Sequence, residues 1–152
     1  MKIIQIILVL CILVGCAPSP QECGQLIIMN CTGTTLSAQL NLVSPTNWNC
    51  ASYFSIAPDV FSKIAETENY PAESGSIIIE NFFTNYNDAS ITVSATLDGI
   101  ERIRTWKYSD RSNDQKTPFN LSDCHFESGE DPRKNYTTMD YCFMIREEDL
   151  MQ

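Results

Sequence analysis

Runs in which apolar and polar residues alternate constrain this chain most, because that period indicates half-buried β-strands rather than helices. In the clearest run, 90–97, every second residue is apolar: Ile91, Val93, Ala95 and Leu97. Asp98-Gly99 follows directly. This dipeptide favours a two-residue hairpin turn, because it tolerates positive φ at both central positions. The sequence therefore predicts an antiparallel hairpin in which 100–108 returns beside 90–97.

The returning strand of this hairpin carries two arginines at positions that the turn would place among apolar residues. A two-residue turn puts Arg102 opposite Ala95 and Arg104 opposite Val93. Guanidinium groups on an apolar face are costly unless the strand bulges or lies at the edge of its sheet. We expect one of these two arrangements for 100–108.

One short helix is predicted near 58–68. Pro58 suits a first helical position, where its missing N–H costs nothing. The apolar residues after it recur at helical spacing: Val60, Phe61, Ile64 and Ala65. Tyr70-Pro71 would end the helix.

The remaining patterns indicate a mainly β fold. Further strands are predicted at 25–30, 36–43, 76–83 and 141–146, and polar loops at 110–115 and 127–134. Because helices do not separate these strands, the sheet should be mostly antiparallel. We expect an antiparallel β-sandwich or a partly open barrel, with an α+β two-layer fold as the alternative.

The first residues have the pattern of an export signal. Lys2 precedes an apolar run that extends from Ile3 to Val14 and ends at small residues. The run is shorter than the roughly 20 apolar residues of a membrane-spanning helix, so no transmembrane helix is predicted. We expect a signal peptide at 1–15, a linker at 16–24, a single β-rich domain at 25–146 and a flexible tail at 147–152. The protein should be extracytoplasmic and secreted.

Leu13-Val14-Gly15-Cys16 resembles the lipobox of bacterial lipoproteins. The resemblance covers only the first twenty residues. It implies that the sulfur of Cys16 is lipidated and becomes the new N-terminus, which would anchor the protein in a bacterial cell envelope. Secretion and lipid anchoring both remain open, and only anchoring would bring the protein to a membrane.

Export determines how the cysteines and asparagines are interpreted. Separated cysteines in an oxidising compartment usually form disulfides. Fifteen pairings are open to the cysteines of the mature chain; proximity in the sequence favours two bridges, Cys31–Cys50 and Cys124–Cys142, with Cys23 paired to Cys16 or free. A bridge of this span stabilises by roughly 3 kcal/mol. Three asparagines lie in Asn-x-Ser/Thr triplets and are candidate glycosylation sites: Asn30, Asn120 and Asn135.

Charge and motif content exclude several classes of function. The chain has 10 basic and 19 acidic residues, a net charge of −9, which argues against nucleic acid and anionic lipid as partners. The single histidine, His125, follows Cys124, but neighbouring residues on a strand point to opposite faces and do not form a nucleophile–base pair. No Cys/His cluster or nucleophile elbow is present. We therefore predict no metal, cofactor or catalytic residue.

The sequence indicates binding rather than catalysis. Trp48 lies in a predicted turn and is the best candidate for a binding aromatic, since turns carry recognition more than strands do. We expect an exported, disulfide-stabilised binding or interaction module for an unknown protein or small-molecule ligand. The alternative is a lipid-anchored envelope lipoprotein with a structural role. A third interpretation is a small secreted hydrolase that uses carboxylates.

Overall fold

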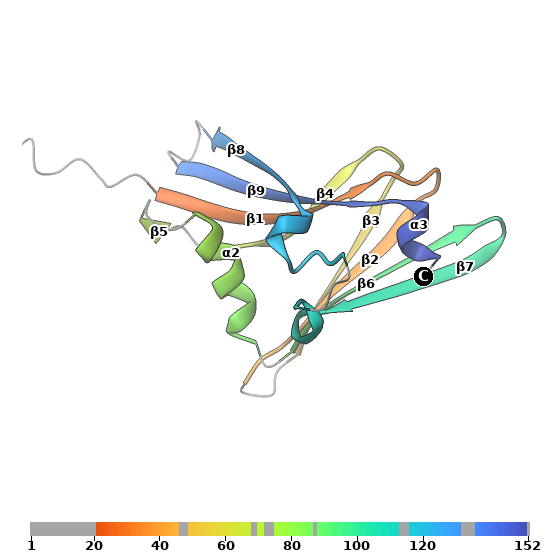
Figure 1. The fold of residues 1–152 in the computed structure, drawn as a ribbon, viewed down its shortest axis with the longest axis horizontal. Helices are drawn as coiled ribbons and strands as arrows, with labels where there is room; N and C mark the ends of the chain where they lie inside the picture. The colour runs from red at the N-terminus through yellow and green to blue at the C-terminus, as the bar shows by residue number, and fades with distance from the viewer. Residues whose placement is uncertain are drawn as a thin grey trace, which may run out of the picture.

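Two β-sheets that pack face to face make up most of the protein (Figure 1). The structure is a computed structural model, and it describes residues 21–45, 49–67, 70–71, 75–86, 88–112, 116–131 and 136–151. The mainly β class predicted from the sequence is confirmed.

The first sheet has the strand order β4-β1-β9-β8: Phe61–Glu66, Gln21–Asn30, Tyr136–Ile145 and His125–Asp131. A short strand, β5 (Tyr70–Pro71), pairs with the start of β1. The second sheet has the order β3-β2-β6-β7: Asn49–Ile56, Leu36–Val43, Asp88–Leu97 and Ile100–Lys107. β1 and β9 are parallel, and the other described pairings are antiparallel, as the pattern predicted.

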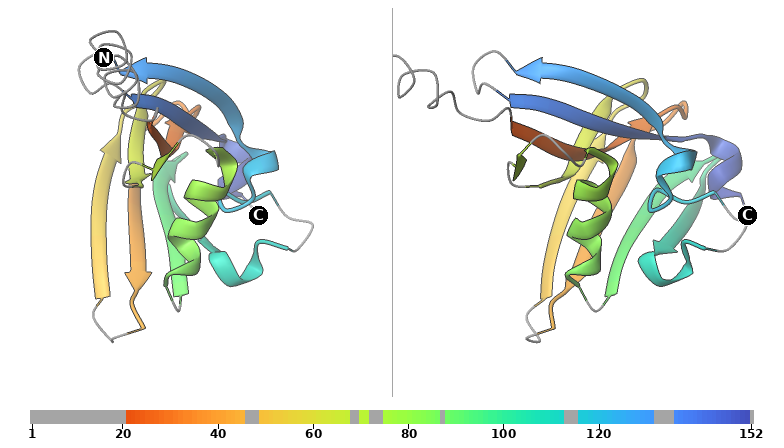
Figure 2. Two further views of the ribbon diagram at one scale, coloured as in Figure 1. Left: turned by 90° about the vertical axis from the view of Figure 1, so that its left-hand side faces the viewer. Right: turned by 60° about the vertical axis from the view of Figure 1, so that its left-hand side comes forward.

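The core lies between the sheets and is closed by a helix. Alternate residues of β2 and β6 are buried, as are Leu26 and Ile28 of β1 and Phe143 of β9. α2 (Gly75–Thr84) lies in the angle where the sheets diverge (Figures 1 and 2). It buries Ile79 and Phe83, which lie four residues apart and so on the same helix face. Two 3-10 turns, Tyr108–Asp110 and Leu121–Asp123, lie in the connections.

The predicted hairpin is confirmed as β6 and β7. Asp98 and Gly99 have φ of 51° and 76°, and the register places Arg102 opposite Ala95 and Arg104 opposite Val93. β7 is an edge strand, which was one of the two expected arrangements.

The helix predicted near 58–68 is wrong. Residues 57–60 form a turn with Asp59 at φ 57°, and β4 follows. The Asp59 amide donates to the carbonyl of Asn30 (2.9 Å), and the Asn30 amide donates to the carbonyl of Val60 (3.0 Å). These long-range bonds hold the segment extended beside β1. Only half of the expected apolar stripe is buried, because Val60 and Phe61 are exposed.

The strand predicted at 76–83 is also wrong, because this segment lies within α2. Two boundaries differ as well. The expected linker ends early, since Gln21–Asn30 is already β1. The expected flexible tail contains α3 (Glu147–Leu150), in which Leu150 is 3% exposed. Asp149 of α3 accepts hydrogen bonds from Lys116 Nζ (2.7 Å) and from the amide of Arg146 (2.9 Å).

Candidate functional site

Asn30, the first candidate glycosylation site, belongs to the core. Its side chain is 0% exposed. Nδ2 donates to the carbonyls of Thr34 and Ile56, both at 2.8 Å. Oδ1 accepts from the amide and the hydroxyl of Thr32, at 2.9 and 2.7 Å. Both Nδ2 protons are used and the atom is enclosed, so a glycan on Asn30 is incompatible with this fold.

The other predicted sites fare differently. Asn120 is half-buried, and its Oδ1 accepts from the amide and hydroxyl of Ser122. Glycosylation there stays a prediction. Cys16, Trp48 and Asn135 lie outside the described residues, so lipidation, the binding aromatic and the third glycosylation site also stay predictions.

The two predicted disulfides are not formed. All five cysteines of the described residues are free thiols: Cys23, Cys31, Cys50, Cys124 and Cys142. His125 lies directly opposite Cys142, so Cys124 points to the other face of the sheet. Burial, with the neighbouring Asp123 carboxylate, raises the pKa of Cys124 to about 12. It is an apolar-site thiol rather than a bridge partner or a nucleophile.

The first predicted bridge fails on distance. Asn30, just before Cys31, bonds to the carbonyl of Ile56 at the end of β3. Cys50 lies six residues back along that strand. At about 3.4 Å per residue this separates the two cysteines by about 20 Å, against a limit of about 7 Å between Cα atoms in a disulfide.

His125 faces solvent. It is exposed on β8, and its Nε2 lies 3.2 Å from Glu127 Oε1. Because Cys124 points to the opposite face of the sheet, Cys124 and His125 form no nucleophile–base pair.

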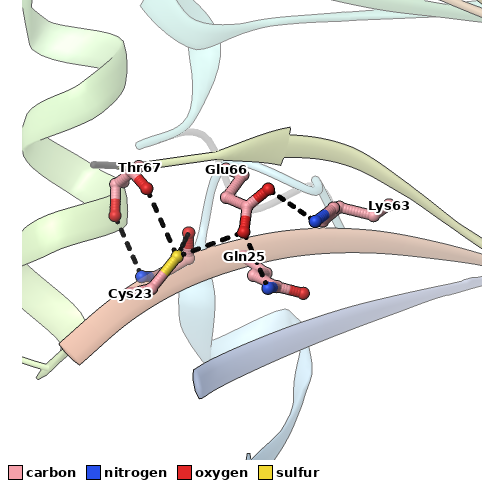
Figure 3. A network of polar contacts seen from close by, with 6 residues as sticks. Cys23, Gln25, Lys63, Glu66 and Thr67 are labelled. Carbon is pink, nitrogen blue, oxygen red and sulfur yellow. Dashed lines mark hydrogen bonds and ion pairs between the residues drawn. The ribbon is translucent and has the colours of Figure 1, made fainter. Parts of the chain in front are cut away.

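A polar network joins the start of β1 to the end of β4 (Figure 3). The Cys23 thiol donates to the carbonyl of Thr67 (3.2 Å) and to Glu66 Oε1 (3.5 Å). Glu66 also accepts from Gln25 Nε2 (3.2 Å) and pairs with Lys63 Nζ (2.5 Å). Burial raises the pKa of Cys23, which is 1% exposed, and Glu66 raises it further. The thiol therefore stays protonated and acts as a hydrogen-bond donor that ties the two strands.

Glu66 belongs to a row of carboxylates across the outer face of the first sheet. The register places Glu66 beside Gln25, Gln25 beside Asp140, and Asp140 beside Glu127. We call these four residues, three carboxylates and the amide of Gln25, the carboxylate row. Partial burial raises the pKa of Asp140, and the charges of Glu127 and Glu66 raise it further against the hydrogen bond from Thr138. Among the described residues, no group of three or more His, Cys, Asp or Glu is arranged to hold a metal ion.

The middle of the outer face of the second sheet has the opposite character, and two charged residues of that face, Asp88 and Glu101, lie beyond it at opposite ends of the β6–β7 pair. Three rows of directly opposed residues cross its four strands: Ser55–Ser37–Ser94–Ile103, Tyr53–Gln39–Thr92–Thr105 and Ala51–Asn41–Ser90–Lys107. All are exposed or half-buried. Lys107, at the edge, is the single charged residue among them. We call these three rows of four the neutral face.

Hydrogen bonds within the neutral face orient its side chains. Gln39 Nε2 donates to Asn41 Oδ1 (2.6 Å) and to the Tyr53 hydroxyl (3.1 Å). The hydroxyls of Thr92 and Thr105 lie 3.0 Å apart. Tyr53 is 75% exposed, so its ring stands in solvent while its hydroxyl is held. The face offers amides, hydroxyls and one fixed aromatic ring.

Sequence reasoning missed both surfaces. The alternation of 36–43 and 90–97 marked polar positions, but β3 and β8 were not predicted as strands, and the rows require all four strands of each sheet. No family model matches the chain, and no curated protein matches its sequence. Within the part of the chain that the structure describes, no helix is long and apolar enough to cross a membrane.

Proposed function

We propose that the protein is an exported binding module that holds its ligand on the neutral face without changing it chemically. One observation carries the proposal. Eleven of the twelve side chains of that face are uncharged, in a chain with 10 basic and 19 acidic residues. Exposed sheet surfaces and edges are ordinarily protected by charged side chains, lysine above all, which prevent association with other chains.

The other outer face supports this interpretation. It carries Lys63, Glu66, Glu127 and Asp140 on adjacent strands. On the second sheet, by contrast, the carboxylates Asp88 and Glu101 border the neutral face and Lys107 lies at its edge. β3, an edge strand, has no charged residue at all in NCASYFSI. An uncharged partner can cover such a surface without the free-energy cost of removing a charged side chain from water.

The carboxylate row is the one arrangement that favours the hydrolase interpretation, because Asp140 with its raised pKa would be the proton donor. Water reaches this row: the side chain of Glu127 is 72% exposed and that of Glu66 33%. A carboxyl that acts as a general acid is kept protonated by burial in an apolar pocket, whereas Asp140 is only half-buried and lies beside an exposed carboxylate. Binding is the better-supported function.

The location of the protein depends on whether residues 1–15 act as a signal peptide and whether Cys16 is lipidated. Mass spectrometry of the protein from its native source would detect diacylglycerol on Cys16, N-glycans on Asn120 or Asn135, or a mature N-terminus with neither. Lipid on Cys16 would make the protein a surface-anchored binding module. An intact leader on a cytosolic product would contradict export.

The binding function is tested with a matched pair of substitutions. Ser37 and Ser128 are both exposed serines on strands, one on the neutral face and one on β8 of the first sheet. Purified wild type, Ser37→Glu and Ser128→Glu are incubated with neutral polysaccharides, polygalacturonate, a Lys-rich peptide, a Glu-rich peptide and phosphatidylglycerol vesicles. We expect wild type and Ser128→Glu to bind at least one probe equally and to return it intact. Ser37→Glu should bind that probe at least tenfold more weakly.

Two results would overturn the proposal. One is that no probe binds to wild type. The other is that Ser37→Glu binds as wild type does, which would place the binding surface elsewhere. Chemical conversion of the bound probe would replace binding with catalysis.

A further inference from the structure

The neutral face also points to a ligand class, and this inference rests on the proposed function. We infer that the ligand is a neutral polysaccharide, with sugar rings stacked on Tyr53 and sugar hydroxyls bonded to the amide and hydroxyl side chains beside it.

Charge removes most other classes. Nucleic acids and anionic lipids are bound by several cations that neutralise phosphates, and Lys107 is the single cation of the face. A basic peptide needs several carboxylates close together, and the two on this side of the sheet, Asp88 and Glu101, lie outside the three rows at opposite ends of the β6–β7 pair. A ligand without charge is what remains.

The polar composition then separates a sugar polymer from a protein. The centres of protein–protein interfaces are enriched in aromatic residues, Met and Arg and depleted in Ser. The middle of the neutral face carries Ser37, Ser94, Gln39 and Thr92. Hydroxyls both donate and accept hydrogen bonds, and so do the hydroxyls of a sugar.

Tyr53 supplies the apolar part of the contact. An exposed aromatic ring costs free energy in water, and its flat apolar face is complementary to the C–H face of a pyranose ring. The bond from Gln39 Nε2 to the Tyr53 hydroxyl (3.1 Å) holds the ring at the end of the middle row.

The length of that row favours a polymer over a single sugar. Tyr53, Gln39, Thr92 and Thr105 stand side by side on four adjacent strands. Three strand spacings of about 4.8 Å give a row of about 14 Å. One pyranose ring would occupy only part of it, whereas a chain of several rings would contact the aromatic residue and the hydroxyls together.

Affinity gel electrophoresis tests the inference directly. The purified protein is run through gels that contain hydroxyethylcellulose, mixed-linkage β-glucan, dextran or soluble starch, with polygalacturonate as the charged counterpart. We expect at least one neutral polymer to retard wild type, and polygalacturonate to have no effect. Retardation should change less than about twofold between low and high salt, since no charge pairs form.

Variants at Tyr53 separate stacking from a general surface effect. Tyr53→Ala should weaken binding at least tenfold, and Tyr53→Phe, which keeps the ring, should stay within about threefold. Phe61→Ala is the matched control, because Phe61 is an exposed aromatic residue (68%) on β4 of the first sheet. It should bind as wild type does. Circular dichroism of all variants checks the fold.

The outcomes distinguish this inference from the proposed function. Binding of a peptide, vesicle or polygalacturonate that Ser37→Glu abolishes would overturn the polysaccharide and keep the binding face. No retardation by any neutral polymer, or full binding by Tyr53→Ala, would likewise overturn the inference. Absence of face-dependent binding to every probe would overturn both.

Discussion

Replacement of Asn30 by alanine should destabilise the fold more than any exposed substitution in the chain. The side chain is fully buried and makes four hydrogen bonds, two donated to Thr34 and Ile56 and two accepted from Thr32. Each bond contributes about 1 kcal/mol net, so the four together contribute about 4 kcal/mol. We expect Asn30→Ala to lower the free energy of unfolding by about 4 kcal/mol, a large fraction of the roughly 5–15 kcal/mol typical of a domain.

Urea unfolding followed by tryptophan fluorescence measures this loss. Trp106 is 5% exposed and packs edge-on against Phe143 with ring centroids 5.5 Å apart, so it reports on the core. The matched control is Asn120→Ala, which changes the same residue type in the same triplet. Asn120 caps a 3-10 turn through Ser122, and its replacement should cost about 1 kcal/mol.

Asn30→Asp separates the two halves of the network. Aspartate keeps the acceptor for Thr32 but presents an oxygen to the carbonyls of Thr34 and Ile56. It should therefore be at least as destabilising as alanine. A loss below about 1.5 kcal/mol for Asn30→Ala, a stable Asn30→Asp variant, or an N-glycan on Asn30 in the folded protein would each refute this reasoning.

Three further predictions test other parts of the structure. Because the pKa of Asp140 is raised in the folded protein, ionisation of this carboxyl destabilises the fold as pH rises through the folded-state pKa. Asp140→Asn should therefore unfold at a higher urea concentration than wild type at pH 7, and this difference should disappear near pH 3. An equal difference at both pH values would contradict the prediction. Asp149→Ala should cost about 2 kcal/mol because it leaves the Arg146 amide without its acceptor and removes one of the two acceptors of the Lys116 ammonium, which keeps its bond to the carbonyl of Met144. Glu148→Ala, at an exposed neighbour, should change urea stability by less than about 0.5 kcal/mol. Cys23 and Cys124, with raised pKa values, should react with a thiol reagent at pH 8 far more slowly in the native protein than in urea, and peptides cross-linked between Cys124 and Cys142 would contradict the free-thiol state.

The parts of the fold that sequence predicted are those that local chemistry determines. The β6–β7 hairpin follows from an alternating strand and a turn whose two residues adopt positive φ. The two arginines opposite its apolar residues indicated either a bulge or an edge strand, and β7 is an edge strand. In these segments, the local sequence and the tertiary structure favour the same backbone conformation.

The wrong prediction of a helix near 58–68 shows the limit of what a local sequence pattern can predict. Pro58 and the apolar spacing after it favour a helix, but the backbone bonds between Asn30 and residues 59 and 60 require an extended chain. An apolar run such as 76–83 is ambiguous, because periodicity does not separate a buried strand from a buried helix. Tertiary contacts determine the secondary structure of both segments, and these contacts cannot be derived from the pattern of a single sequence.

The neutral face is a property of register, and this is why sequence reasoning did not reach it. Ser37, Gln39 and Asn41 are visible as alternate polar residues, but their position beside Ser94, Thr92 and Ser90 depends on how β2 pairs with β6. A slip of one residue would turn the polar set of a strand into the core. Burial of Leu36, Ala38, Leu40 and Leu42 opposes that slip. The same apolar residues that stabilise the sandwich therefore bring uncharged side chains from four strands onto one surface.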